Sequence, residues 1–491
     1  MAQVELQNTL MVRSVAAGAD TLRRLAYSDP EAFPVLLDSA ASGPLSRCSI
    51  LAAYPEAALW QDGSGRLHAT GMPLPPGGGF LAALEAAWRS EHVASGDGAS
   101  GACASGGRAH ACGGRGDGAA ANQGPGPFRG GWVVFLGYEL AVEIEPRLNL
   151  AVGACTAGEA PAAFALRIPA GLMYDHVARR AWLFAEGGRE DRLEALSAAL
   201  AALPAAGRPA GAPVRVEEEA PHRFRSRVEG ALDYIRAGDI YQANLSRPWR
   251  GELDRQLPLR AATTALYERL RAVNPAPFAG LAQFHNWRLL SSSPERLVRV
   301  DGGRVETRPI AGTRPRSGAA GRDQREIAGL IAHPKERAEH VMLIDLERND
   351  LGRICRPGSV HVDEFMCIES YAHVHHIVSN VCGQLLPDLT PIDVVRAVFP
   401  GGTITGCPKF RCMQIIAELE GEARQAYTGA LGFINTDGSM DLNILIRSLT
   451  LQERSVEFRT GAGIVADSDW QRELAETRAK ARGLLAALAG P

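Results

Sequence analysis

Two pairs of glutamates have the residue type and spacing that chemistry on an anionic substrate would need. Glu336 and Glu339 lie three positions apart in the stretch HPKERAEHVMLIDLERND. Glu473 and Glu476 have the same spacing in GAGIVADSDWQRELAETRAK, and Lys480 follows four positions later. On a helix each set falls on one face, where neighbouring carboxylates repel unless positive charge lies between them. Two such pairs facing each other would bind Mg2+ and an anionic substrate, whereas each pair taken alone is far more typical of a solvated helix face.

Local signals predict the helices that would carry both pairs. Ser468 followed three residues later by Gln471 is a capping box, so we expect the last helix to begin at Ser468. Pro334 falls near the start of the other helix, where the missing N–H of proline costs little. Both glutamate pairs are therefore predicted to be helical.

The composition of the chain is that of a globular protein without a nucleic-acid or membrane partner. Of its 491 residues 46% are hydrophobic and 22% are charged, and the net charge is −3. A charge so close to zero gives no electrostatic reason to bind nucleic acid or an anionic membrane. No apolar run is long enough to span a bilayer, and residues 1–30 lack the pattern of a signal peptide. The nine cysteines include no C-x-x-C pair, so we interpret them as reduced thiols and expect a cytoplasmic protein.

Shifts in composition divide the chain into two regions. Residues 1–215 read as a mixed α/β region with an insertion at about 94–128, where Gly, Ala and Ser dominate. Such a segment cannot bury enough apolar surface to offset its ordering entropy, so we expect the insertion to be disordered. The Pro-, Gly- and Ala-rich segment 203–213 reads as a linker. Residues 220–488 form the second region, which is denser in patterned structure.

Alternating apolar runs separated by turn signals predict antiparallel sheets in both regions. Residues 34–55 read as a strand, a Gly-Pro turn and a second strand. Asp301–Gly303 and Asn435–Gly438 each separate two alternating runs and so predict hairpins. Helical spacing or capping signals predict further helices over 191–202, over 224–238 and from Thr390. We therefore expect an α+β fold in which large, mainly antiparallel sheets form a sandwich with helices packed outside.

Three further features suggest anion binding, and each has an alternative interpretation. FPGGTITGCPK is glycine-rich, but Pro408 interrupts the pattern that a phosphate-binding loop requires, so we reject nucleotide binding. The backbone N–H groups of Gly461–Gly463 could face a carboxylate. Arg447 ends an apolar strand and would bind either a structural acid or a substrate carboxylate. For His376, which lies in an apolar strand, a hydrogen-bonded core histidine is the default interpretation.

A set of motifs between Gly238 and Lys480 resembles one known family. In order they are GDIYQANLS, SSSPERL, ETRPIAGTRPR, KERAEHVMLIDLERNDLGRI, HVHHIVS, FPGGTITGCPK, YTGALGF, ILIRS and GAGIVADSDWQRELAETRAK. Together they resemble the chorismate-utilising enzymes, which include the component I subunits of anthranilate synthase and aminodeoxychorismate synthase together with isochorismate and salicylate synthases. The resemblance covers the whole second region and, more weakly, the ordered parts of the first. It implies an anthranilate synthase component I-like fold.

The resemblance also implies roles for the candidate residues. One Mg2+, which binds the ring carboxylate of chorismate, would be held by Glu336, Glu339, Glu473 and Glu476. Glu339 and Glu476 would be the most direct ligands. Glu295 would be the general acid that protonates the departing C4 hydroxyl, which requires a carboxyl group with a raised pKa. The ring would be lined by Thr403 and by two catalytic residues, Thr313 and His376. The pyruvyl carboxylate would contact Tyr427, Arg447 and the backbone of Gly461, Ala462 and Gly463, and the other substrate-binding residues would be Ala311, Gly312 and Lys480.

Gln242 is the most informative single position under this resemblance. Family members that add water carry a lysine there as general base, and a glutamine cannot take up a proton at neutral pH. Ammonia is a nucleophile that needs no such activation. We therefore interpret Gln242 as a catalytic residue of an amination enzyme, which argues against isochorismate and salicylate synthases.

The choice between amination at C4 and amination at C2 depends on opposing features. Three segments resemble aminodeoxychorismate synthase component I, an enzyme on the route to 4-aminobenzoate and folate. They are GGTITGCPK, GDIYQANLS and LLDSAASGPLSRCSILAAYP. PIAGT instead matches anthranilate synthases, because Ala311 cannot act as the covalent nucleophile that some aminodeoxychorismate synthases carry as lysine. We expect amination at C4, with anthranilate synthase component I as the alternative. A third reading, a non-catalytic protein that binds chorismate or a glutaminase subunit, is disfavoured by the presence of Glu295, Glu339 and Glu476.

Two further expectations follow from the resemblance. The chain contains no G-x-C-x-G nucleophile elbow, so a separate glutamine amidotransferase subunit would supply ammonia through a channel. Leu37, Asp38 and Ser39 match the place where relatives bind tryptophan. We expect no strong feedback regulation from this tryptophan-like pocket.

Overall fold

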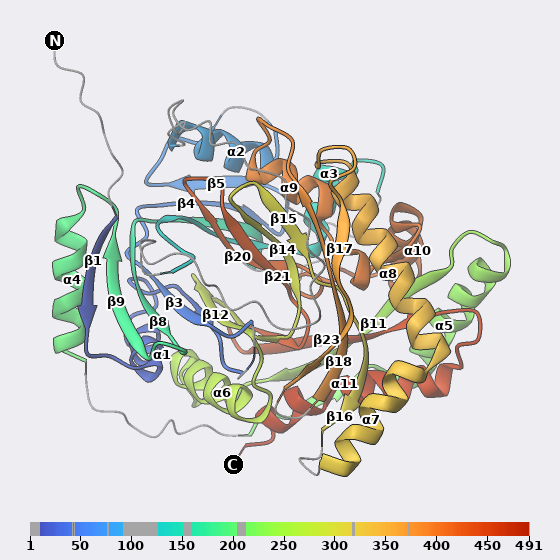
Figure 1. The fold of residues 1–491 in the computed structure, drawn as a ribbon. Helices are drawn as coiled ribbons and strands as arrows, with labels where there is room; N and C mark the ends of the chain where they lie inside the picture. The colour runs from blue at the N-terminus through green and yellow to red at the C-terminus, as the bar shows by residue number, and fades with distance from the viewer. Residues whose placement is uncertain are drawn as a thin grey trace.

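Two large β-sheets form the centre of the molecule (Figure 1). The computed structural model describes residues 10–91, 126–150, 160–203, 213–316, 320–371 and 374–490, apart from residues 42, 44, 76, 77 and 149. The insertion predicted to be disordered lies outside the described residues except for 126–128, and most of the predicted linker also lies outside them.

The first sheet, sheet A, joins strands from both ends of the described chain. All of its neighbouring strands pair antiparallel. Its order is β1 (Met11–Val15), β9 (Arg180–Ala185), β8 (Ala170–Asp175), β3 (Cys48–Ala53), β2 (Val35–Asp38), β12 (Phe278–Phe284), β13 (Trp287–Ser293), β22 (Ser448–Gln452), β23 (Ser455–Ile464), β11 (Gln242–Glu252) and β10 (Val216–Glu218), with β19 (Gly406–Cys407) paired to β11.

The second sheet, sheet B, is also antiparallel throughout. Its order is β16 (Ile310–Pro315), β18 (Val374–Gln384), β15 (Arg304–Thr307), β14 (Arg296–Asp301), β21 (Met440–Ile444), β20 (Ala430–Asn435), β6 (Gly131–Leu136), β7 (Pro161–Ile168), β4 (Ala57–Asp62) and β5 (Leu67–Thr70), with β17 (His361–Ser370) paired to β18. Sheet B therefore brings the PIAGT segment, in β16, next to the HVHHIVS segment, in β18.

An aromatic core holds the two sheets face to face. The ring of Phe135 in β6 lies 4.7 Å from that of Trp287 in β13, and the ring of Phe164 in β7 lies 4.9 Å from that of Phe284 in β12. All four rings are buried. Large aromatic side chains contribute much of the apolar area that stabilises such a core. The predicted α+β sandwich of antiparallel sheets is thus confirmed.

Helices cover the outer faces of both sheets (Figure 1). Those on sheet A are α1 (Ala19–Ser28), α4 (Glu190–Ala201), α6 (Leu259–Val273) and α11 (Trp470–Leu488), and those on sheet B include α2 (Phe80–Glu91), α8 (Pro334–Gly352) and α9 (Pro391–Val398). α5 (Pro221–Arg236) and α10 (Lys409–Glu420) pack with α11 on β11 and β23. The shorter or peripheral helices are η1 (Tyr138–Leu140), α3 (Ala141–Ile144), α7 (Ala320–Ala332) and η2 (Gly402–Ile404). None of the described helices combines the length and the apolar run that a bilayer span requires.

Several local signals of the sequence set element boundaries as predicted. Thr390 caps α9, because its hydroxyl accepts the N–H of Asp393 at 3.1 Å while the Asp393 carboxylate accepts the N–H of Thr390 at 2.9 Å. Pro334 is the first residue of α8. The turns at Asp301–Gly303 and Asn435–Gly438 connect β14 to β15 and β20 to β21.

The predicted start of α11 at Ser468 is wrong: the cap is Asp469, one residue later, and the helix itself begins at Trp470. The carboxylate of Asp469 caps the helix by accepting the N–H groups of Gln471 at 3.2 Å and Arg472 at 3.1 Å. A carboxylate is a stronger acceptor than a hydroxyl, so it takes this position. Ser468 instead donates a hydrogen bond of 2.7 Å to Glu473, one of the predicted metal ligands.

The two regions predicted from composition contribute neighbouring strands to both sheets. β2 of the first region pairs with β12 of the second in sheet A, and β6 pairs with β20 in sheet B. The division into regions 1–215 and 220–488 stays a prediction. The shared sheets imply that neither region closes its apolar core alone.

This sharing predicts that residues 213–491 do not fold by themselves. Their expression without residues 1–212 would remove β2 from beside β12 and β6 from beside β20, and would expose Phe284 and Trp287 to water. We expect aggregation or a non-cooperative thermal transition, measured by circular dichroism against the full chain. A cooperative transition of the fragment near that of the full chain would contradict this expectation.

Candidate active site

Paired strands β11 and β23 form the frame of the candidate site. Ala243 to Glu252 pair with Ile464 to Ser455 without a break in register, so Asn244 lies opposite Gly463. Gln242 is the first residue of β11. The Gly-Ala-Gly segment predicted to face a carboxylate therefore lies directly beside the strand that carries Gln242.

The two glycines of this segment are required by the side chains around them. A Cβ on Gly461 would lie 2.6 Å from both Asn244 Oδ1 and the Tyr427 hydroxyl, and a Cβ on Gly463 would lie 2.4 Å from Gln242 Nε2. Both positions face the same side of β23 because strand side chains alternate. Ala462 faces the other side and is fully buried in the core under α5 and α10.

Gln242 is buried and held in one orientation. Its Nε2 donates a hydrogen bond of 3.1 Å to Oε1 of Glu339 on α8. Since a carboxylate only accepts, this contact fixes which end of the carboxamide is nitrogen. The Gln242 Oε1 atom is then a buried acceptor, and it has no hydrogen-bond partner among the described residues.

Glu295 lies between β13 and β14 and is only 5% exposed. Burial raises the pKa of this carboxyl to about 7, although Thr403, the backbone of Ile310 and the charges of Arg447 and Lys480 act in the opposite direction. A substantial fraction of Glu295 is therefore protonated at neutral pH. Such a group can donate a proton to a poor leaving group.

His376 and Arg447 add a neutral donor and a cation to the site. His376 of β18 is 1% exposed, and burial next to Arg447 lowers the pKa of its imidazole to about 3. It is therefore neutral at physiological pH. The backbone of Arg447 adopts φ 51° between β21 and β22, and Glu295 is the acid that interacts with its guanidinium. The register of sheet B places Thr313 opposite His376, and Ala311, which is buried, opposite Ile377.

Lys480 and Tyr427 approach Gly461 from two different elements. The Lys480 Nζ donates a hydrogen bond of 3.1 Å to the carbonyl oxygen of Gly461 and pairs with Glu476 at 2.7 Å. Burial raises the pKa of the Tyr427 hydroxyl, so this group stays protonated. With Arg447, these groups supply two cations and a hydroxyl donor suited to a carboxylate.

Glu336 of the first glutamate pair is held by β16. Its Oε1 pairs with Arg314 at 2.6 Å, and its Oε2 is buried without a hydrogen-bond partner in the described part of the chain. Gly312 has φ 61°, and a Cβ there would lie 2.8 Å from Glu336 Oε2. Any other residue would be strained and would collide with this carboxylate, so the glycine of PIAGT lets Glu336 approach the strand.

The second glutamate pair is also engaged by protein groups. Glu473 is buried and accepts from Ser468, while Glu476 is about half exposed and pairs with Lys480. Over the ranges that the structure describes, no three His, Cys, Asp or Glu side chains come together as a metal site. The chemistry of the donor set still fits Mg2+, because all four predicted ligands are carboxylates and one Glu336 oxygen lacks a partner.

Several buried polar atoms of this site have no hydrogen-bond partner among the described residues, as do others elsewhere in the molecule. A buried unpaired polar atom costs about 1–3 kcal/mol unless something binds it. Such atoms are exceptions in folded proteins, and those of this site are available to bind a ligand. Those of this site are Gln242 Oε1, Asn244 Oδ1, Glu295 Oε1 and Glu336 Oε2.

The predicted tryptophan-like pocket lies away from this site. The carboxylate oxygens of Asp38 in that pocket both have hydrogen-bond partners. In sheet A, β12, β13 and β22 separate β2 from β23. The Asp38 carboxylate accepts from Arg271 at 2.7 Å and from Ser49 at 2.9 Å, and the Ser39 hydroxyl donates to a backbone carbonyl. Leu37 is half-buried on β2. Tryptophan binding at these residues stays a prediction.

Sequence reasoning missed Asn244 and Arg424. Gln242, Asn244 and Ser246 are polar at every second position of β11, a spacing that puts all three on one face of a strand. That alternation was the available signal for Asn244. Nothing comparable marks Arg424, which looks like a surface charge in EGEARQAY although its side chain is 1% exposed.

Comparison with known proteins gives concordant matches. The model of the chorismate binding enzyme family matches residues 87–486. An anthranilate synthase component I-like protein of Synechocystis sp. is 41% identical over 366 residues, which cover 74% of each chain. Aminodeoxychorismate synthase component 1 of Bacillus subtilis is 38% identical over 372 residues, 74% of this chain and 77% of that protein. The crystal structure of anthranilate synthase component I from Streptococcus pneumoniae TIGR4 has a TM-score of 0.74 and 30% identity, over 90% of this chain and 93% of that one.

The raised pKa of Glu295 predicts a pH-dependent loss of stability. Folding favours the neutral acid, whose pKa rises from 4.5 to about 7, so the stabilisation is complete below pH 4.5 and is lost as pH rises toward 7. Glu295→Gln cannot ionise. The unfolding free energy of this variant, measured with urea, should gain about 3 kcal/mol on that of the wild type between pH 4.5 and pH 8. A difference that is the same at both pH values would contradict the assignment.

Proposed function

Since the chain belongs to the chorismate binding enzymes, we propose that it aminates chorismate at C4 with ammonia, as aminodeoxychorismate synthase component I does. The product would be 4-amino-4-deoxychorismate, a precursor of 4-aminobenzoate and folate. The main support for ammonia as the nucleophile is the orientation of the Gln242 carboxamide. Its nitrogen donates to Glu339, which leaves the Gln242 oxygen as a buried acceptor. An amide cannot deprotonate water at neutral pH, but its oxygen can accept an N–H of ammonia.

The proposed reaction exchanges a C4–O bond for a C4–N bond. Glu295 donates its proton to the C4 hydroxyl, which leaves as water, and ammonia supplies the electron pair of the new bond. The added nitrogen then loses one proton, which can return to the Glu295 carboxylate and restore the acid. A pKa of about 7 suits both directions of this transfer. Ala311 cannot form a bond to the ring, so the substitution proceeds without a covalent enzyme intermediate at that position.

The charges around the site support an anionic substrate. Arg447, Lys480 and the protonated Tyr427 hydroxyl would bind the pyruvyl carboxylate near Gly461. Thr403 and neutral His376 would line the ring. The four glutamates would hold a Mg2+, which would offset about half of their negative charge and supply a Lewis acid for the ring carboxylate. Such an ion would compete with Arg314 for Glu336 and with Lys480 for Glu476.

The source of ammonia would be a separate subunit. The sequence has no nucleophile elbow of a glutamine amidotransferase, so we propose a glutaminase partner that delivers ammonia to the side of the ring near Gln242. An ammonium salt at alkaline pH should replace this partner in vitro, because part of the ammonium is then present as ammonia, the nucleophile.

A second candidate function is that of anthranilate synthase component I, which forms 2-aminobenzoate and pyruvate. Ala311 favours it, because PIAGT matches that enzyme, and so does the similarity to proteins with that name. Both candidates use the same acid and the same nucleophile. They differ in the carbon that ammonia attacks and in the loss of pyruvate.

Product analysis separates the two functions. We expect the purified protein, mixed with chorismate, Mg2+ and ammonium at alkaline pH, to form a non-aromatic aminated product of chorismate. Chromatography and mass analysis should show 4-aminobenzoate only after a lyase is added. Release of 2-aminobenzoate with an equal amount of pyruvate would instead identify an anthranilate synthase.

Replacement of Glu295 tests the general acid. Glu295→Gln should lower kcat by about 10²–10⁴-fold with little change in KM for chorismate, because the amide cannot protonate the leaving group. In the wild type, kcat/KM for chorismate at a fixed concentration of unprotonated ammonia should fall as pH rises above about 7, since the free enzyme then loses the acid form of Glu295. Glu295→Asp keeps an ionisable acid and should retain part of the activity and this pH dependence. A fully active Glu295→Gln variant would exclude the role.

A further inference from the structure

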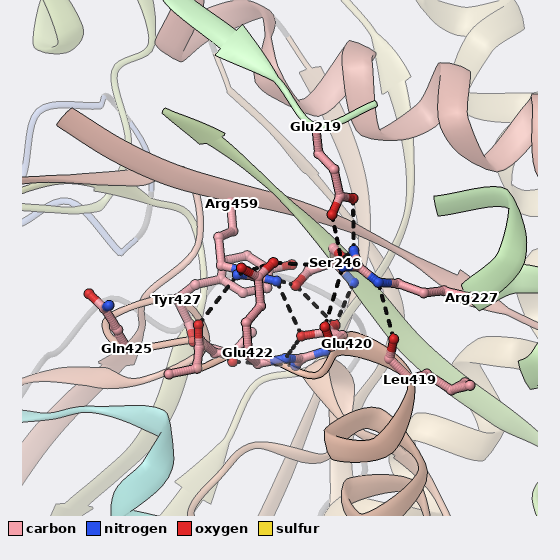
Figure 2. Close-up of polar contacts among 12 residues, drawn as sticks. Glu219, Arg227, Ser246, Leu419, Glu420, Glu422, Gln425, Tyr427 and Arg459 are labelled. Atoms are coloured by element: carbon pink, nitrogen blue, oxygen red, sulfur yellow. Dashed lines mark hydrogen bonds and ion pairs between the residues drawn. The ribbon is translucent and has the colours of Figure 1, made fainter. Parts of the chain in front are cut away.

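A buried ion cluster joins the end of α10 to β11 and β23 (Figure 2). Its centre is Glu420, the last residue of α10, whose side chain is 1% exposed, as are those of Arg424 and Arg459. Glu420 pairs with Arg424 at 2.6 Å and with Arg459 at 3.4 Å, and it accepts the N–H of Ser246 at 2.7 Å. Charges buried this deeply are costly unless they are paired, so their contacts are specific.

Arg424 extends from this cluster to three parts of the substrate site. Its guanidinium donates to the carbonyl of Asn244 on β11 at 2.6 Å and to the carbonyl of Ile404 at 3.3 Å. Ile404 directly follows Thr403. The same guanidinium lies over the ring of Tyr427, 5.6 Å from its centre. One side chain thus contacts the strand of Gln242, the loop of Thr403 and the tyrosine next to Gly461.

We propose that Arg424 is a positioning residue for the subsite that binds the pyruvyl carboxylate of chorismate. This inference rests on the function proposed for Tyr427 and the Gly461–Gly463 segment. The guanidinium is planar and presents its donors in a rigid fork, so its bonds to Asn244, Ile404 and Glu420 fix the spacing between strand, loop and helix. Arg424 acts through these groups and through Tyr427.

Arg227 offers a matched control within the same cluster. It is also a buried arginine, it pairs with Glu219 at 2.8 Å, and it donates to the carbonyl of Glu420 at 3.3 Å. Figure 2 shows it on the opposite side of Glu420 from Tyr427. Its other hydrogen bonds go to the carbonyls of Ser246 and Leu419, and it pairs with Glu422 at 3.7 Å. None of these three residues is a proposed substrate contact.

The test compares Arg424→Gln with Arg227→Gln and with the conservative Arg424→Lys. Both glutamine variants lose a buried charge and should have lower melting temperatures. Only Arg424→Gln should raise KM for chorismate, by about tenfold or more. Its kcat and its KM for ammonium should change little, because the carboxylate subsite binds the substrate and the transition state equally. Arg424→Lys keeps the charge without the fork and should show an intermediate KM. Arg227→Gln should leave KM for chorismate within about twofold of the wild type.

Equal changes in KM for both glutamine variants, or an unchanged KM in Arg424→Gln, would overturn the proposal. If Arg424→Gln does not fold, the comparison of Arg424→Lys with Arg227→Gln replaces it. A KM for chorismate that is no higher in Arg424→Lys than in Arg227→Gln would then overturn the proposal. Chorismate binding, measured by calorimetric titration, should rank the variants as KM does. The titration separates the role of Arg424 from the proposed function, because it measures binding and not turnover. If the wild type formed no aminated product, the proposed function would be refuted, but the ranking of chorismate affinities would still test the role of Arg424.

Discussion

The candidate site depends on the pairing of β11 with β23. Their unbroken register sets Gln242 and Asn244 beside the Gly-Ala-Gly segment and leaves space for those side chains only because glycines stand at 461 and 463. A slip of one residue would turn every side chain of the strand to its other face. Helices α5, α10 and α11 pack on this strand pair and bring Lys480 and the buried ion cluster to it.

Two equally buried glutamates near these strands have pKa values shifted in opposite directions. Burial alone would raise the pKa of Glu420, but Arg424 and Arg459 pair with it and lower the pKa, so it remains an anion that holds structure together. Glu295 is equally buried and makes no ion pair of this kind with any residue that the structure describes, and its pKa rises to about 7. The same residue type thus serves as a structural charge in one place and as a proton donor in the other.

Much of this arrangement could be predicted from the sequence, and the rest depends on tertiary contacts. Turn and capping residues such as Gly438 and Thr390 act locally, so they set hairpins and helices correctly, and the ordered motifs indicated the family. The cap of α11 was misplaced because Ser468 and Asp469 are both good caps, and the choice depends on the bond of Ser468 to Glu473. The partners Arg314 for Glu336 and Arg459 for Glu420 join segments whose spatial proximity no local pattern reveals.

The central claim is that Glu295 protonates the C4 hydroxyl of a chorismate whose pyruvyl carboxylate lies beside Gly461. The most direct test is a crystal structure of the Glu295→Gln variant with chorismate and Mg2+ bound. The account predicts the C4 hydroxyl within hydrogen-bond distance of residue 295 and the pyruvyl carboxylate against Tyr427, Arg447 and the backbone of Gly461–Gly463. A substrate bound in the reverse orientation, with its C4 hydroxyl out of reach of residue 295, would contradict it.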